Sequence, residues 1–213
     1  SLNLFKAAWA ATKLQKGRTR LITDDLNFPT DLYVLQGIAN QLGPDFEVAI
    51  ARSSDGLTLT REDLEKVLNE ETALVVLSHV AFKSAYMHDM KAATDLVHSH
   101  GALMLWDLSH SAGVVPVQLN EAGADLAIGC TYKYLNGGPG APAYLFVKKE
   151  LQQKMESPVW GWFGDENPFA FNLEYRPAQD MSRFLVGTPP VLSMAGIEPG
   201  LDLILKAGIG SIR

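Results

Sequence analysis

The sequence predicts an α/β fold built on a mainly parallel β-sheet, and three observations support this. From about residue 30, segments with helical periodicity alternate with short β-branched or apolar runs, the pattern of βαβ units. Residues 73–78 form a continuous apolar run bounded by polar residues, as expected of a strand buried on both faces. Hydrophobic residues make up 47% of the 213 residues and charged residues 20%, which excludes a disordered chain.

Helices are predicted where helical periodicity meets start or stop residues. Thr60 should cap a helix that runs to about Leu68, and Asp63 at its third position gives an imperfect capping box. Gly43-Pro44 and Gly101 should each end another helix. With an amphipathic segment at the start of the chain, the predicted helices span residues 2–14, 31–42, 60–68, 89–100, 149–155 and 191–207.

Strands are predicted where short apolar or β-branched runs lie between turn residues. These strands span residues 46–51, 73–78, 102–106, 125–129 and 143–147. Residues 157–190 are rich in proline, glycine and aromatic residues, which predicts loops with one short strand over 184–186.

Composition limits the classes of partner. The net charge is −6 and no Lys/Arg cluster is longer than a pair, which argues against nucleic acid, although an anionic cofactor needs only a local site. No apolar stretch reaches the roughly 18 residues of a membrane span, and the first residues lack the order of a signal peptide. A single cysteine, Cys130, fits a reducing compartment. We therefore expect a soluble cytoplasmic protein whose partners are small molecules.

Polar residues lie at or just after the ends of three of the predicted strands. Ser78-His79 follows the first, Asp107 with His110 the second, and Thr131-Tyr132-Lys133 the third. In open α/β sheets ligands bind beyond the carboxyl ends of the strands, so a carboxylate, an imidazole, a phenol and an amine should converge there. The sequence therefore predicts an enzyme-like site.

Each of these residues also has an ordinary structural explanation. A carboxylate after a strand often only forms a turn, and a lysine in a loop is more often solvated than catalytic. The combination favours function: residues 137–140 (Gly-Gly-Pro-Gly) allow close backbone approach after Lys133, and Asp107 ends a strand too apolar to lie on the surface.

Six ordered motifs lie along the whole chain. The two longest are LWDLSHSAG at 105–113 and CTYKYLNGGPG at 130–140. The shorter ones lie at 27–31, 78–80, 161–164 and 183–190. These motifs resemble those of kynureninase, a fold-type I enzyme that depends on pyridoxal 5'-phosphate (PLP). The resemblance implies a three-layer sandwich of the PLP-dependent transferase type.

The resemblance also implies a role for individual residues. Lys133 would hold PLP as a Schiff base and move protons, and Asp107 would pair with the pyridine nitrogen, which keeps the ring an electron sink. Trp162 and Thr188 would reach the site of a partner subunit, which implies a homodimer. The residues expected to contact the cofactor are Phe28 (stacked on the ring), Pro29, Thr30, Asp31, Ser78, Asp107, His110, Tyr132, Lys133, Trp162 and Thr188.

The implied activity is hydrolysis of L-kynurenine or 3-hydroxykynurenine to anthranilate or 3-hydroxyanthranilate and L-alanine, in tryptophan catabolism. Tyr132 is the expected proton donor. Thr188 stands where animal members tend to have Asn, which favours kynurenine itself. Two departures indicate local differences: Asp165 replaces the usual His, and Ala81-Phe82 replaces the frequent Asn-Tyr.

The resemblance further implies a protein about twice as long. Residues 1–190 would form the PLP-binding large domain, incomplete at its N-terminus, and residues 191–213 a helix leading towards a C-terminal small domain. Parts of the phosphate site and the arginine that grips the substrate carboxylate have no counterpart here. Efficient catalysis by these residues alone is therefore not expected.

Several alternatives remain open at this stage. A class V aminotransferase would share Lys133 and Asp107, whereas a cysteine desulfurase needs a cysteine in a mobile loop, and Cys130 lies three residues before the lysine. A non-catalytic PLP-fold fragment fits the missing ends but not the intact pair of site residues. Trp162 could be ordinary packing. His98 and His100 cannot share a helix face, which argues against a metal site.

Overall fold

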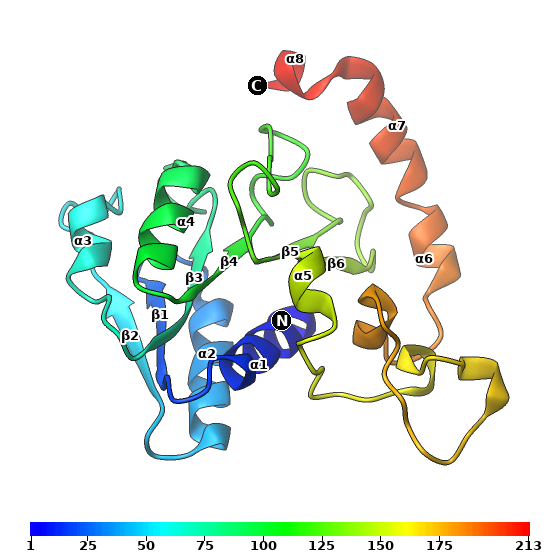
Figure 1. Cartoon of the computed structure of the whole chain (residues 1–213). Coiled ribbons are helices and arrows are strands. Elements are labelled where there is room, and N and C mark those ends of the chain that lie inside the picture. The colour runs from blue at the N-terminus through cyan, green and yellow to red at the C-terminus, as the bar shows by residue number, and fades with distance from the viewer.

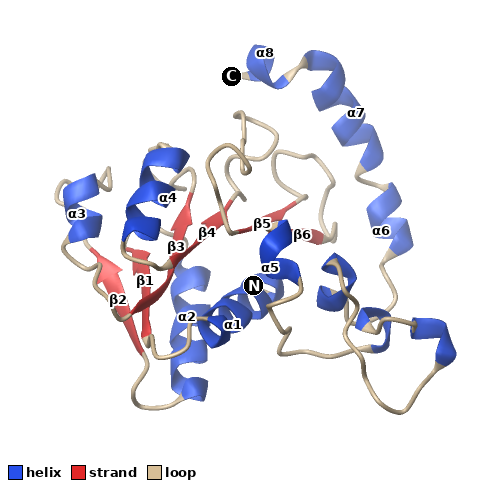
Figure 2. Cartoon of the chain, viewed as in Figure 1, coloured by secondary structure: helices blue, strands red, loops and turns tan.

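A computed structural model describes all 213 residues and contains one six-stranded sheet (Figures 1 and 2). The strand order is β2-β1-β3-β4-β5-β6, and every neighbouring pair is parallel except β5 with β6. The strands are β1 (Arg20–Asp24), β2 (Glu47–Ala51), β3 (Thr72–Ser78), β4 (Leu103–Asp107), β5 (Leu126–Cys130) and β6 (Ala143–Val147). This mainly parallel sheet confirms the predicted fold class.

Helices cover both faces of the sheet and complete a three-layer sandwich (Figure 1). One face packs on α1 and α2, and the other on α3 and α4. Side chains alternate accordingly along β4, where Trp106 belongs to the core under α4 and Leu105 to the core under α1. The helices are α1 (Leu2–Leu14), α2 (Pro29–Leu42), α3 (Arg61–Glu65), α4 (Met90–Ser99), α5 (Lys149–Gln152), α6 (Val191–Ala195), α7 (Glu198–Ala207) and α8 (Ile209–Ile212). None has the length and apolar character needed to cross a membrane.

Strand β1 is the one strand that the sequence did not predict. It lies between β2 and β3, and four of its five residues are buried. Only Leu21 and Ile22 are strongly apolar, since Arg20 starts the strand and Asp24 ends it. The apolar run is therefore too short to be recognised without its neighbours.

The strand predicted at 184–186 is wrong, because Met181–Phe184 form a 3₁₀ helix instead. Buried side chains take the place of a β-ladder there. The guanidinium of Arg183 donates to the carbonyl oxygens of Ala178 (2.8 Å) and Gln152 (2.6 Å), and Lys6 Nζ donates to the carbonyl of Phe184 at 2.7 Å. The backbone therefore does not form a strand here. The buried side chains of Lys6 and Arg183 hold this segment in place by hydrogen bonds to backbone carbonyl groups.

Three predicted helices differ in extent from those observed. The helix after Thr60 ends at Glu65 and the one after Lys148 ends at Gln152. The segment 191–207 forms two helices, α6 and α7, because Pro199 near the start of α7 has no backbone N–H to continue the earlier helix. Figure 1 shows that α6 to α8 extend away from the sheet.

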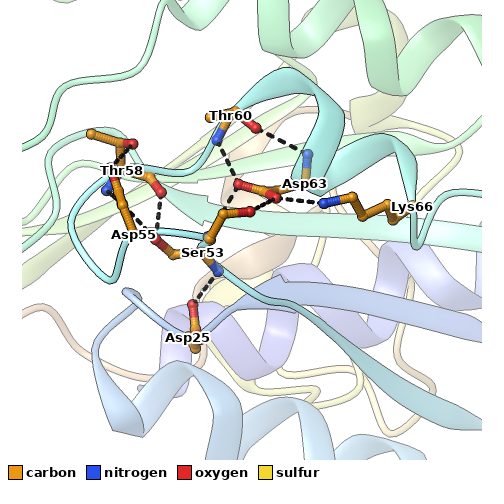
Figure 3. A network of polar contacts seen from close by, with 8 residues as sticks. Asp25, Ser53, Asp55, Thr58, Thr60, Asp63 and Lys66 are labelled. Carbon is orange, nitrogen blue, oxygen red and sulfur yellow. Dashed lines mark hydrogen bonds and ion pairs between the residues drawn. The ribbon is translucent and has the colours of Figure 1, made fainter.

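The predicted capping box at the start of α3 is complete (Figure 3). Asp63 N donates to Thr60 Oγ1 at 3.1 Å, and Thr60 N donates to the Asp63 carboxylate at 3.3 Å. The same carboxylate accepts hydrogen bonds from Ser54 and Lys66, which lowers the pKa of Asp63. These contacts fix the loop between β2 and α3 on the outer edge of the sheet.

Gly129 in β5 has no space for a side chain. It pairs with Tyr144 of β6, and a Cβ atom at position 129 would overlap the Tyr144 phenol ring. Gly129→Ala should therefore lower the free energy of unfolding by about 1–3 kcal/mol, the usual cost of overpacking. Urea unfolding of single and double variants measures this. Tyr144→Val should recover most of the loss in the double variant, and independent, additive effects would contradict the proposed overlap.

Candidate active site

A cavity of about 320 Å³ lies at the carboxyl ends of β4 and β5. The strand register brings this edge together, because Ser78 pairs with Asp107 and Asp107 pairs with Ile128. Seven of the predicted site residues line the cavity: Phe28, Thr30, Asp31, Asp107, His110, Tyr132 and Lys133. Its volume is in the range of pockets that hold small ligands.

Lys133 projects into this cavity from the loop after β5. Its Nζ lies 3.0 Å from His110 Nε2 and 5.7 Å from the ring centroid of Phe28. Burial, and then the positive charge of Lys133, lower the pKa of His110. The imidazole is therefore neutral near pH 7, and its Nε2 accepts a hydrogen bond from the lysine amine.

The loop that follows Lys133 is shaped by residues in left-handed backbone conformations. Asn136 has φ +58° and Gly138 has φ +76°. Gly137 N donates to the carbonyl of Thr131 at 2.9 Å, which folds the loop back on the end of β5. The loop after Lys133 therefore depends on left-handed backbone conformations that glycine adopts at low cost.

Asp107 ends β4 with its side chain on the same face of the sheet as Leu105. Only 6% of the residue is exposed. Ser109 N donates to Asp107 Oδ1 at 2.7 Å, and the side chain also lines the cavity. A buried carboxylate with so few partners is suited to a cationic group of a ligand.

Asp31 supplies a second buried carboxyl group from the first turn of α2. It is 4% exposed, and its Oδ2 has no hydrogen-bond partner. Burial, and then the negative charge of Asp107, raise the pKa of Asp31 to about 8. Asp31 is therefore protonated and uncharged at neutral pH. Its protonation removes the charge repulsion that two ionised carboxyl groups would exert on each other.

Phe28 is held at the cavity by Asn27, a buried asparagine that belongs to the 27–31 motif but was not among the predicted site residues. Asn27 Oδ1 accepts hydrogen bonds from Phe28 N at 2.8 Å and from Ser78 Oγ at 2.6 Å. The Phe28 ring lies edge-on to Phe82, with centroids 5.2 Å apart, and Phe82 stacks on His110 at 6.3 Å. Asn27 and Phe82 thus join three predicted site residues, Phe28, Ser78 and His110, and no local sequence pattern reveals these contacts.

Four of the predicted cofactor residues do not line the cavity. Ser78 is buried and donates its hydroxyl to Asn27 Oδ1, and Pro29 is the first residue of α2. Trp162 lies in a separate aromatic cluster with Phe163, and Thr188 is exposed in the stretch after Phe184. For Trp162 and Thr188, the expected reach into a partner subunit stays a prediction.

Eight lining residues were absent from the predicted set: Ser1, Asn3, Ser109, Ile128, Gly129, Cys130, Ala141 and Ala143. Asn3 comes from the first turn of α1, which the sequence marked only as a helix, and Ser109 follows Asp107. Cys130 ends β5 in the wall of the cavity rather than in a mobile loop. Cys130 could have been predicted as a lining residue, because it directly follows the apolar strand predicted at 125–129.

The charge state of Asp31 predicts how stability depends on pH. Between pH 4 and about 8 the unfolded chain has lost the Asp31 proton and the folded chain retains it, so stability should fall as pH rises, by at most about 1.4 kcal/mol per unit. Asp31→Asn should flatten this slope in the cofactor-free protein. Urea midpoints from pH 5 to 9 measure it. Asp24, whose pKa burial raises to about 7, titrates in both proteins, and equal slopes would contradict the assignment.

Known proteins resemble this chain along its whole length. Kynureninase from Pseudomonas fluorescens is 44% identical over 217 residues, and kynureninase from Burkholderia mallei (strain SAVP1) is 45% identical. In both comparisons all of this chain is covered and half of the relative. The chain thus spans about half the length of the curated relatives it matches.

Solved structures with the same fold include cysteine desulfurases. The enzyme from Thermococcus onnurineus NA1 superimposes with a TM-score of 0.82 at 23% identity, and CsdA from Escherichia coli with 0.83 at 16% identity. Each comparison covers 98% of this chain and about half of the other, 50% and 51%. At these identities the likeness establishes the fold alone.

A family model settles the wider relationship. The model of the aminotransferase class-V family matches residues 1–213, which is the whole chain. This match agrees with the mainly parallel sheet and with the lysine and aspartate at its carboxyl edge. The chain belongs to the aminotransferase class-V family.

Proposed function

We propose that the protein is a kynureninase, which hydrolyses L-kynurenine or its 3-hydroxy form to an anthranilate and L-alanine. The observation that carries the proposal is one cavity lined by Lys133, Asp107 and Phe28. The chain around this cavity is 44–45% identical throughout to kynureninases of two bacteria. The desulfurase alternative fits less well, because Cys130 lies in a strand end and not in a loop.

The residues of the cavity fit pyridoxal 5'-phosphate, the cofactor of this family. Lys133 offers an amine for covalent attachment, and the Asp107 carboxylate can pair with a protonated ring nitrogen. The unpartnered Asp31 Oδ2 beside Asp107 is a buried polar atom that the protein alone leaves unsatisfied. Phe28 would cover one ring face, and Thr30, His110 and Tyr132 would border the ring or its phosphate. When bound, the cofactor withdraws electrons and makes the substrate α-proton acidic.

Proton transfers at the substrate fall to this chain's own side chains. The Lys133 amine removes the proton from the α-carbon and returns a proton there after the bond between Cβ and Cγ has broken, and His110 Nε2, 3.0 Å away, accepts a hydrogen bond that fixes the amine. Asp107 would pair its negative charge with the ring nitrogen of the bound cofactor, and protonated Asp31 limits the repulsion between the two carboxyl groups. Water adds to the γ-carbonyl carbon, the bond between Cβ and Cγ breaks, and Cβ takes up a proton.

Tyr132 is the proposed donor of the proton at the γ-oxygen and at Cβ. It lines the cavity next to Lys133, and about half of the residue is exposed (51%), so it can meet a substrate. Tyr132→Phe should bind the cofactor normally and lower kcat by about 10²–10⁴-fold, the usual contribution of general acid catalysis. Cofactor titration and turnover measure the two effects separately. A fully active variant would refute the role.

The complete site is proposed to need a second subunit and a small domain in addition to the residues of this chain. Trp162 and Thr188 lie away from the cavity of their own chain, and they would reach the cofactor of a second copy in a homodimer. Residues 1–190 would form the large domain, and residues 191–213 would lead to a small domain. Thr188 favours kynurenine over 3-hydroxykynurenine, and a kcat/KM ratio above one for kynurenine supports that preference.

Incubation of the full-length protein with L-kynurenine tests the proposed function. Fluorescent anthranilate and L-alanine should appear in equal amounts without added 2-oxo acid. A class V aminotransferase would instead require the oxo acid and would leave the carbon chain intact. Turnover that depends on an oxo acid, or no anthranilate at all, would reject the kynureninase proposal.

A further inference from the structure

Phe82 lies beside the Lys133 cavity without lining it. Its half-buried ring stacks on the imidazole of His110, with centroids 6.3 Å apart and ring planes 29° apart. The same ring meets Phe28 edge-on, with centroids 5.2 Å apart. Both distances lie in the range of stabilising contacts between rings. Phe82 therefore contacts two lining residues of the cavity from outside it.

The turn that carries Phe82 is closed by backbone contacts. Val80 and Met87 form an antiparallel bridge at its base. Inside the turn, Ala81 N donates to the carbonyl of Tyr86 at 2.8 Å. These contacts do not involve the side chain of Phe82, so a substitution at position 82 should change the ring and leave the turn in place.

His110 is the residue through which Phe82 can act on the chemistry. Its imidazole is half-buried, and its Nε2 lies 3.0 Å from Lys133 Nζ. Burial is the largest cause that lowers the pKa of His110, because a ring shielded from water is less easily charged. A neutral imidazole accepts a hydrogen bond from the lysine amine, whereas a protonated imidazole offers no acceptor and repels the amine.

Charged and titratable groups reach His110 from every segment around it. They are Asp31 of α2, Lys83 of the turn, Asp107 at the end of β4, Cys130 at the end of β5, and Tyr132, Lys133 and Tyr134 of the following loop. The charge of Lys133 lowers the pKa of His110 and the charge of Asp107 raises it. These two charges act in opposite directions, so the shielding of the imidazole from water remains the largest effect.

We propose that Phe82 is a positioning residue of the active site, whose ring covers the His110 imidazole and keeps it as the hydrogen-bond acceptor of the Lys133 amine. The consequence for turnover rests on the proposed function, whereas the effect on His110 does not. Phe82→Ala removes the covering ring. Phe82→Tyr keeps the ring and introduces the residue that is frequent among similar proteins at this position.

NMR titration of the His110 ring nitrogens in the full-length, cofactor-free protein tests the proposal without turnover. The signals are identified by their loss in His110→Gln. Phe82→Ala should raise the pKa of His110 by at least about 0.5, because water then reaches the imidazole. Phe82→Tyr should leave this pKa unchanged. An unmoved pKa in Phe82→Ala would overturn the proposal, and if that variant does not fold, Phe82→Leu decides by the same criterion.

Phe46 provides a matched control. It is also half-buried, but it precedes the amino end of β2, whereas the cavity lies at the carboxyl ends of β4 and β5. Phe46→Ala should leave the pKa of His110 unchanged. The same rise in Phe46→Ala as in Phe82→Ala would indicate general loosening of the protein and would overturn the proposal.

The pH dependence of kcat with L-kynurenine links His110 to the Lys133 amine. A pKa change of about 0.5 alters the proportion of protonated imidazole about threefold, so the ratio of kcat at pH 6 to kcat at pH 8 should fall up to about threefold in Phe82→Ala. Phe82→Tyr and Phe46→Ala should keep the ratio. A constant ratio despite a raised pKa would overturn the link to Lys133. If no protein forms anthranilate, the kynureninase proposal fails and the NMR titration alone decides the role of Phe82.

Discussion

Lys133→Ala should abolish covalent attachment of the cofactor and lower kcat by at least about 10⁴-fold in the full-length protein. The expected loss is large because the same amine forms the covalent bond and moves the proton at the substrate α-carbon. Its Nζ lies among His110, Phe28 and Tyr132, and no other lysine lines the cavity. Visible absorption of the bound cofactor and anthranilate formation measure the two losses.

Two control variants separate chemistry from charge and folding. Lys133→Arg keeps the positive charge beside His110 but cannot replace the amine in either role, so it should be as inactive as Lys133→Ala. Lys91→Ala removes an exposed lysine of α4 that pairs only with Asp95, and it should be fully active. An active arginine variant would show that charge alone is sufficient and would contradict the assigned role.

Asp107→Asn should lower kcat by about 10²–10³-fold, the usual cost of removing one electrostatic partner of the reacting group. Asparagine has the same shape and can still accept the Ser109 N–H, so the fold should persist. The loss follows because a neutral amide cannot keep the cofactor ring nitrogen protonated. Steady-state kinetics with kynurenine, together with the thermal midpoint, distinguish lost chemistry from lost folding.

Asp125 provides a matched control for this variant. It is also a buried carboxylate, 5% exposed, but it precedes β5 at the other end of the sheet. It binds His98 Nε2 at 2.7 Å and accepts the Met104 N–H at 2.9 Å. Asp125→Asn should lower stability and leave kcat within about twofold, because Asp125 lies at the amino end of β5 and the reacting atoms lie beyond its carboxyl end. Equal kinetic losses in the two variants would indicate a general effect of buried carboxylates.

The strand ends explain why part of the site could be predicted from the sequence. Asp107 and Lys133 follow apolar strands, and parallel strands carry the residues after them to one edge of the sheet. Both residues line the cavity at that edge. Asn27 and Phe82 could not be predicted, because they act only through contacts with Phe28, Ser78 and His110 that depend on the tertiary structure.

The errors in the fold have the same physical origin. Strand β1 has a short apolar run, and its interior place, second from the edge of the sheet, comes from pairing with β2 and β3. The segment 184–186 has a strand-like pattern, yet Lys6 and Arg183 satisfy nearby backbone groups in another geometry. Local propensity therefore fails where side chains distant in sequence decide the backbone path.

Reduction of the full-length holoenzyme with borohydride, followed by peptide mapping, tests the central claim most directly. Borohydride makes the covalent link between the cofactor and its lysine permanent, so mass spectrometry identifies the modified residue. The cofactor mass should appear on the peptide that contains Lys133 and on no other lysine. A cofactor mass on another lysine, or an unmodified Lys133 in cofactor-saturated protein, would contradict the assigned site.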